Sequence, residues 1–189
     1  MHRKNILDKL TNYSPEYAEE KEFRASFISF IKGNIDCFER SLQIGHITGS
    51  AWIVNKDRDK ALLTHHAKLN RWLQPGGHAD GDSRIDQVSM KEAREETGLS
   101  SLRLLSDNIF DIDIHSIPAR NHEPEHLHYD IRFIFEADEH ESLTVTSESK
   151  DLQWVSLSSL LEKTEKNQSI LRMAEKVATY CQETAGQKQ

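Results

Sequence analysis

The chain is short of cysteine, of long apolar runs and of positive charge, and each shortage excludes a class of protein. Its two cysteines, Cys37 and Cys181, lie far apart, which excludes a disulfide framework and a Cys-x-x-Cys motif. Two reduced thiols fit a cytoplasmic protein. No apolar run approaches the ~18 residues of a membrane span, and no apolar segment follows the basic start Met1-His-Arg-Lys-Asn. We therefore expect neither membrane association nor a signal peptide.

Acidic residues outnumber basic ones by 31 to 24, which gives a formal net charge of −7. This balance argues against a nucleic-acid polymer as partner. A small anionic substrate stays compatible with it, because a bound cation can invert the local field. The 189 residues, 37% hydrophobic and 29% charged, suffice for one domain with a buried core plus an extension.

Residues 1–43 are predicted to be an N-terminal helical extension. Ser14-Pro15-Glu16 has the residue order of a helix start, and a short second helix is expected over 35–40. The apolar residues that recur at helical spacing are Phe23, Phe27, Phe30 and Ile31. We interpret this stripe as core or as a subunit contact, which makes a homodimer plausible.

Residues 44–189 are predicted to form the main domain, with strands and helices in mixed order. The pattern favours an α+β or three-layer arrangement over an alternating parallel sheet. Strands are expected at 46–54 and 61–65 (as a hairpin), 102–115, 125–136 and 152–155, a short extended segment at 72–77, and helices at 84–97, ending at Gly98, and 165–181.

The helix expected over 84–97 places carboxylates where its buried face should be. At 100° per residue, Glu92 shares a face with the apolar residues, and Glu95 and Glu96 flank it one turn on. Three inward carboxylates repel each other unless a cation lies among them. Oxygen ligands on one rigid face suit Mg²⁺ or Mn²⁺. On spacing alone, an ordinary helix with a charged face remains the alternative.

Gly76-Gly77 precedes this helix, and the whole segment resembles the Nudix box, which runs Gly, five residues, Glu, seven residues, Arg-Glu-apolar-x-Glu-Glu-x-Gly-apolar. Ser83 stands where the first Glu belongs and Lys91 where Arg belongs; Asp82 and Asp86 are nearby acids that could compensate. The resemblance extends over residues 44–162. The matching positions are Gly77, Glu92, Ala93, Glu95, Glu96, Gly98 and Leu99.

The resemblance to the Nudix family implies an α/β/α sandwich with a mixed sheet. It also implies a metal-dependent hydrolase that cuts a diphosphate linkage in a small nucleoside diphosphate derivative. Glu92 and Glu96 would then be metal ligands, and Glu95 a further ligand or the group that orients water. The Gly76 carbonyl would be an extra ligand, and Lys91 would hold the glutamates in place.

Family members often carry another acid on the loop before the final strand, as metal ligand or base. Glu148 is the candidate here, with a solvated loop acid as the alternative. Lys68 and Arg71, in the segment that leads to the glycines, are candidates for contacts with phosphate oxygens.

The strand expected over 125–136 has a polar face that carries two histidines. His126, His128, Asp130 and Arg132 alternate with apolar residues. Three interpretations stay open: a second metal site, for Zn²⁺, made of His78, His126 and His128; contacts of His78 and Asp130 with a substrate base or sugar; or a solvated strand face.

Two other functions compete with the hydrolase. The first is a non-catalytic Nudix-like nucleotide-binding or sensor module, favoured by Ser83 and Lys91. The second is an enzyme similar to isopentenyl diphosphate isomerase, whose chemistry needs a cysteine near the site; neither Cys37 nor Cys181 is well placed. The sequence does not distinguish nucleoside triphosphates, nucleotide sugars, ADP-ribose and dinucleoside polyphosphates as substrates.

Overall fold

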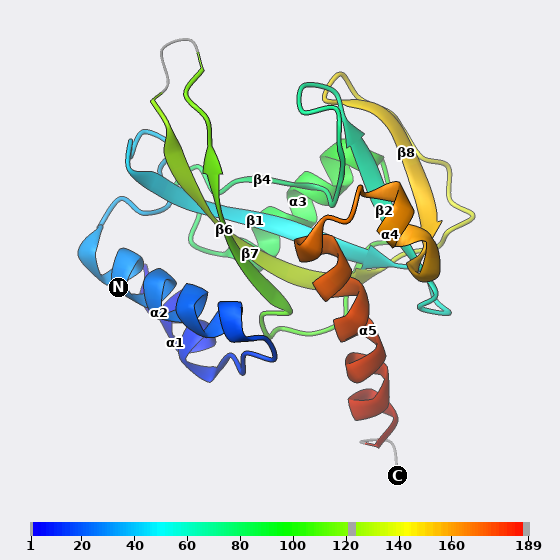
Figure 1. Ribbon diagram of the computed structural model, residues 1–189, viewed down its shortest axis with the longest axis horizontal. Coiled ribbons are helices and arrows are strands. Elements are labelled where there is room, and N and C mark those ends of the chain that lie inside the picture. The colour runs from blue at the N-terminus through cyan, green and yellow to red at the C-terminus, as the bar shows by residue number, and fades with distance from the viewer. Residues whose placement is uncertain (1, 121–123, 187–189) are drawn as a thin grey trace. The chain divides into compact units, whose positions relative to one another are not determined.

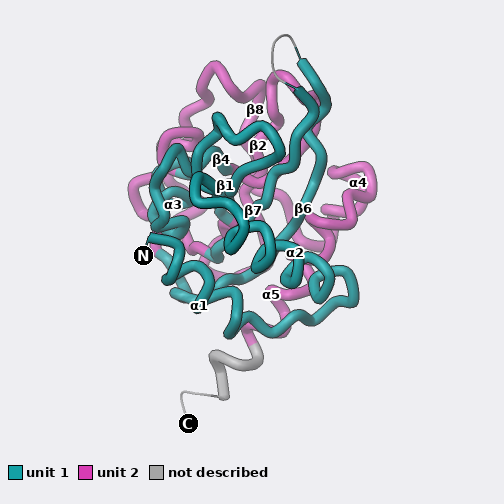
Figure 2. The backbone as a smooth tube through the Cα atoms, turned by 90° about the vertical axis from the view of Figure 1, so that its left-hand side faces the viewer, with its two compact units in different colours: residues 1–51, 76–93, 104–134 teal, residues 52–75, 94–103, 135–189 magenta. Residues whose placement is uncertain are grey.

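The computed structural model describes residues 2–120 and 124–186, which fold into two compact units (Figure 2). The first unit is built from the residues up to 51, from 76–93 and from 104–134. The second is built from 52–75, from 94–103 and from the residues after 134. Strand β1 (Gly45–Val54), helix α3 (Ile85–Thr97) and strand β7 (His126–Glu136) each supply residues to both units.

The other elements are shorter or lie within one unit. In chain order they are α1 (Lys4–Asn12), α2 (Ala18–Gly33), β2 (Lys60–His66), β3 (Trp72–Leu73), β4 (Gly76–His78), β5 (Arg103–Leu104), β6 (Asp111–Ile117), β8 (Ser149–Ser156), the 3₁₀ turn η1 (Leu157–Ser159), α4 (Leu160–Lys163) and α5 (Gln168–Gly186). The chain is α+β, as predicted.

Helices α1 and α2 lie side by side in the first unit (Figure 1). The predicted helix start at Ser14 is wrong, because α2 begins at Ala18. The carboxylate of Glu20 reaches back to accept the backbone N–H groups of Glu16 at 2.9 Å and Tyr17 at 3.0 Å, and thereby caps the helix. The helix predicted over 35–40 is also wrong, because residues 35–38 form turns.

The aromatic stripe of α2 packs inside the first unit. Phe27 and Ile31 are fully buried, and Phe30 is nearly so. The Phe30 ring stacks on Tyr129 of β7 with 4.0 Å between centroids, and Phe27 meets the same ring edge-on at 5.3 Å. The interpretation of the stripe as core is therefore confirmed for these residues, while the homodimer stays a prediction.

The strand layer of the first unit is built from β1, β4, β6 and β7. Strand β4 pairs antiparallel with β1, with His78 opposite Thr48 and Gly76 opposite Ser50. Strand β6 pairs antiparallel with β7 along its whole length, and Figure 1 shows the two strands next to each other. The N–H of Leu127 on β7 donates to the carbonyl of the residue just before β1, at 3.3 Å.

Helix α3 packs its apolar side against β1. A β-carbon at Gly49 would lie 2.9 Å from both the Ile85 and the Ser89 side chains, so only glycine lets the helix come this close. Gly98 then ends the helix with a left-handed φ of 77°, as predicted.

The second unit is an antiparallel group around β2. Val54 lies opposite Ala61, which confirms the predicted hairpin of β1 and β2, but β2 pairs along its length with β8, which was not predicted. The strand predicted over 102–115 is instead two strands, β5 and β6. None of the helices in the described residues is both long and apolar enough to span a bilayer.

Candidate functional site

The carboxylates of helix α3 differ in exposure. Glu96 is 7% exposed and Glu92 is half-buried, whereas Glu95 is exposed. Residues four apart on a helix lie nearly above one another, while adjacent residues differ by about 100°. Glu92 and Glu96 therefore share a face, and Glu95, which was expected to point inward with them, lies at its exposed edge.

The two glycines before the helix are needed for different reasons. A β-carbon at Gly77 would lie 2.6 Å from Cδ of Glu92, so only glycine allows β4 to run this close to the carboxylate. A β-carbon at Gly76 would collide with Ser50 of β1 instead. Gly77 therefore lets the backbone of β4 lie directly against the Glu92 carboxylate.

Two residues depart from the Nudix box: Ser83 lies just before helix α3, and Lys91 lies within it. Lys91 pairs with Glu92, with 3.0 Å between Nζ and Oε1. Ser83 is half-buried just before the helix. Of the two nearby acids, Asp82 is held by the Arg84 guanidinium, whose hydrogen bonds lower the pKa of that carboxyl.

The second unit gathers the candidates that lie on loops. The N–H of Ala67 donates to the carbonyl of Glu148 at 2.8 Å, and the N–H of His66 donates to the carbonyl of Arg71 at 2.9 Å. Glu148 thus lies beside the loop that carries Lys68 and Arg71. All three side chains are exposed.

The strand layer of the first unit has two chemically different faces. Successive residues of a strand point to opposite sides. Gly49 and Gly77 face helix α3, as their contacts with that helix show. Their neighbours Thr48 and His78, which are paired in register, therefore face away from it. The face turned away from α3 carries the histidines.

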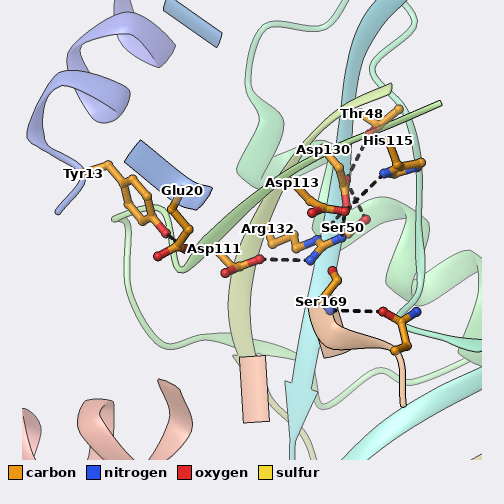
Figure 3. Close-up of polar contacts among 11 residues, drawn as sticks. Tyr13, Glu20, Thr48, Ser50, Asp111, Asp113, His115, Asp130, Arg132 and Ser169 are labelled. Carbon is orange, nitrogen blue, oxygen red and sulfur yellow. Dashed lines mark hydrogen bonds and ion pairs between the residues drawn. The ribbon is translucent and has the colours of Figure 1, made fainter. Parts of the chain in front are cut away.

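A buried ion cluster occupies part of this second face (Figure 3). The guanidinium of Arg132 contacts Asp130 at 2.7 Å, Asp111 at 2.9 Å and Asp113 at 3.1 Å. Burial alone would lower the pKa of Arg132, but the three carboxylates raise it above its ordinary value. The cluster ties β6 to β7.

Asp130 also ties β7 to β1. Its Oδ1 accepts the hydroxyls of Thr48 at 3.0 Å and Ser50 at 2.8 Å, while Oδ2 accepts from Arg132. Asp130 and Arg132 are each only 2% exposed. The interpretation of this strand face as solvated is therefore wrong at these two positions, and the carboxylate predicted to contact substrate is committed to holding strands together.

The histidines of this face come together, with one partner that was not predicted. His46 of β1 joins His78 of β4 and His128 of β7, with ring centroids 4.8–5.0 Å apart. The ring of His126 also lies 5.0 Å from His46, but its Nδ1 lies 2.9 Å from the carbonyl of Pro124. His46 was missed because its partners come from strands that are distant in sequence.

The sequence matches the model of the NUDIX domain over residues 46–175. That range includes helix α3, both glycines and the three clustered histidines. None of the curated proteins matches the chain.

Solved structures share the fold. A NUDIX-family hydrolase from Clostridium perfringens is 25% identical, with a TM-score of 0.52, and the match covers 71% of this chain and 97% of that one. An Ap4A hydrolase from C. elegans is 15% identical, with a TM-score of 0.55 and coverage of 74% and 98%. A MutT protein from Methanosarcina mazei is 19% identical, with a TM-score of 0.54 and coverage of 74% and 96%.

Proposed function

Because the chain belongs to the Nudix family, we propose that it is a divalent-metal-dependent hydrolase that cuts a diphosphate linkage in a nucleoside diphosphate derivative. The observation that carries this proposal is the fit between β4 and helix α3. The Glu-x-x-Glu-Glu pattern lies on one helix, and Gly77 leaves the space that the Glu92 carboxylate fills.

The residues present suit a hard divalent cation such as Mg²⁺ or Mn²⁺. Glu92 and Glu96 share a helix face, and Glu96 is 7% exposed, so its negative charge would be stabilised by an ion. Glu95, at the exposed edge, is suited to orient water or to complete the ligand set. The carbonyl of Gly76 is a further proposed ligand.

The chain's own groups hold this carboxylate array in place. Lys91 pairs with Glu92 and so fixes one carboxylate, although it lacks the two-pronged geometry of arginine. A bound divalent ion neutralises the diphosphate and lowers the pKa of the attacking water. Lys68 and Arg71 are proposed to contact phosphate oxygens, and Glu148, on the adjacent loop, is proposed as an additional acid–base group.

A non-catalytic nucleotide-binding module is the second candidate, and one observation favours it. Ser83 supplies no carboxylate at the start of α3, and Arg84 already engages the neighbouring Asp82. Asp86, half-buried in the first turn of the helix, is the remaining acid that could replace the missing glutamate.

The substrate is tested directly with the full chain. Nucleoside triphosphates, Ap4A, ADP-ribose and nucleotide sugars are incubated with Mg²⁺ or Mn²⁺, and released phosphate and nucleotides are measured. The matched variants are Glu96→Gln on the helix and Glu22→Gln, an exposed glutamate of α2.

Metal-dependent release that is lost in Glu96→Gln and kept in Glu22→Gln supports the hydrolase and names its substrate class. Binding of nucleotides without turnover under any metal would instead support the binding module. In that case Ser83→Glu is the variant to examine for restored hydrolysis. Cytoplasmic location and a homodimer stay predictions.

A further inference from the structure

We propose that His46, His78 and His128 form a binding site for a transition-metal ion of the Zn²⁺ class, separate from the carboxylates of α3. One ring nitrogen from each histidine can be chosen so that all three lie within 4.8 Å of one another. Zn–N distances of about 2.0–2.1 Å hold tetrahedral ligands roughly 3.4 Å apart, so binding an ion would draw these nitrogens closer together through rotation of the rings.

The fold itself brings these imidazoles together. Each comes from a different strand of the first unit, so none of their spacing depends on a flexible loop. His78 is fixed by the pairing of β4 with β1, and His128 by the pairing of β6 with β7. The salt bridge of Arg40 to Asp80 holds the turn that follows His78. A site on rigid strands is pre-organised for its ligand.

Three ring nitrogens of this cluster, two on His46 and one on His128, are buried and lack hydrogen-bond partners among the described residues. Within residues 2–120 and 124–186, neither nitrogen of His46 nor Nε2 of His128 has one, and His46 is only 3% exposed. Buried polar atoms in folded proteins are nearly always paired, so exceptions call for an explanation. A coordinated ion would occupy the lone pairs that protein donors leave unused.

The protonation state of the cluster is compatible with ligation. Burial, followed by the neighbouring histidines, lowers the pKa of His46 to about 4 and that of His128 to about 2, while a backbone interaction at Leu42 acts in the opposite direction on His46. Both rings are therefore neutral near pH 7, as metal ligation requires. Neutral imidazoles attract a phosphate poorly, which disfavours an anion in this place.

The ligand set selects the kind of metal. Three imidazole nitrogens without a carboxylate suit Zn²⁺ and its neighbours in the transition series, whereas Mg²⁺ and Ca²⁺ prefer oxygen ligands. Tetrahedral Zn²⁺ needs a fourth ligand. His126, whose ring lies 5.3 Å from that of His128, or a water molecule would supply it.

The proposed site lies on the opposite side of β4 from the carboxylates. Gly77 faces Glu92, and the next residue, His78, faces the other way among the histidines. An ion held there would not take part in hydrolysis directly. It would clamp the three-residue strand β4 to β1 and β7, and so fix the backbone that approaches Glu92.

The test measures metal binding, not activity. The full chain carrying Glu92→Gln and Glu96→Gln, which weakens the carboxylate site, is stripped of metal and titrated with Zn²⁺ against a chromophoric chelator. Co²⁺ is used in parallel, because its visible absorption reports the geometry and ligands of the site. Three substitutions are then added singly: His46→Asn, His128→Asn and, as a half-buried position, His78→Asn. The control is His140→Asn, an exposed histidine of the second unit.

We expect one equivalent of Zn²⁺ per chain, a tetrahedral Co²⁺ spectrum, and binding weakened at least about 100-fold by each cluster substitution but not by His140→Asn. Zn²⁺ at a hundredfold excess over its Kd should also raise Tm by roughly 5–10 °C. Absence of Zn²⁺ binding, or equally tight binding by His78→Asn, would overturn the proposal. His78→Asn decides the result if a more buried variant does not fold. Hydrolysis plays no part in this readout, so the proposal and the proposed function fail separately.

Discussion

The two faces of strand β4 offer a metal ion opposite chemistry. On one face, Gly77 lies against the carboxylate of Glu92 on helix α3; on the other, His78 lies among the imidazoles of His46 and His128. Carboxylates select hard cations that also bind phosphates, and imidazoles select zinc-like cations. Because neighbouring strand residues point to opposite sides, a single step along the chain separates the two environments.

The two faces also differ in what surrounds the metal-binding groups. The carboxylate side includes Glu95, which is exposed to solvent. The histidine side adjoins the fully paired ion cluster around Arg132 and contains ring nitrogens shielded from solvent. An open site suits catalysis, whereas a closed one suits a structural role. Four substitutions test whether the faces act independently.

The largest effect is expected on the histidine face, at Arg132. Arg132→Met leaves the buried Asp111 and Asp130 and the half-buried Asp113 without their counter-charge, which should lower the free energy of unfolding by about 3–5 kcal/mol. Urea denaturation at pH 7 measures the change. The exposed Arg120→Met serves as control and should stay within about 0.5 kcal/mol of the parent chain. A loss below 1 kcal/mol for Arg132→Met would mean that the cluster does not hold the strands together.

The next effect belongs to the carboxylate face. Glu96→Gln removes a proposed metal ligand while keeping the size of the side chain. We expect kcat in Mg²⁺ to fall on the order of 1,000-fold, the upper end for one group that stabilises transition-state charge. Zn²⁺ binding at the histidines should not change. Parallel losses of hydrolysis and zinc binding would show that the two faces are one site.

The adjacent glycines separate the faces most sharply, with smaller effects. Gly77→Ala pushes on Glu92, so we expect hydrolysis to fall by up to about 100-fold with zinc affinity unchanged. Gly76→Ala pushes on Ser50 and should lower the free energy of unfolding by about 1–3 kcal/mol. Steady-state kinetics and urea denaturation of both variants decide this. Identical profiles for the two would contradict the assignment of the glycines to opposite faces.

The smallest effect concerns the segment that follows α3. Hydrogen bonds from Ser100 and Ser101 lower the pKa of Glu141 from 4.5 to about 2. The unfolded chain therefore takes up this proton more readily than the folded one. The stabilisation is complete above pH 4.5 and is lost as the pH falls toward 2.

Glu141→Gln should flatten that part of the stability curve and change little at pH 7 relative to the exposed control Glu162→Gln. Thermal unfolding between pH 2.5 and 7 measures the difference. A variant whose stability still falls as steeply as the parent's between pH 4.5 and 2.5 would show that these hydrogen bonds do not contribute.

Much of the fold could be predicted from local patterns in the sequence. The period of α3, its end at Gly98 and the spacing from Gly77 to Glu92 are all readable within one segment, and the structure places them as expected. The alternation over 126–136 predicted a strand with a histidine-bearing face, and β7 is that strand. Where a short stretch of chain determines the geometry, the sequence was sufficient.

Pairings between distant segments could not be predicted in the same way. The polar residues Asp130 and Arg132 were expected on a wet face, but Asp111 and Asp113 from the neighbouring strand let them be buried as ions. His46 became a candidate only once β1 was placed beside β4. The start of α2 was misplaced because Glu20 caps it from inside the helix. Each error concerns a contact whose partner no local pattern reveals.

Because Phe30 stacks on Tyr129, the N-terminal helices cover an aromatic side chain of the domain. Tyr129 neighbours His128, so the aromatic seal of α2 and one metal-binding candidate lie on consecutive residues of one strand. A shortened chain that starts at residue 44 would bare this aromatic ring to water and invite self-association. A related chain without the two helices would therefore need a less apolar residue at position 129, so that the exposed strand does not self-associate.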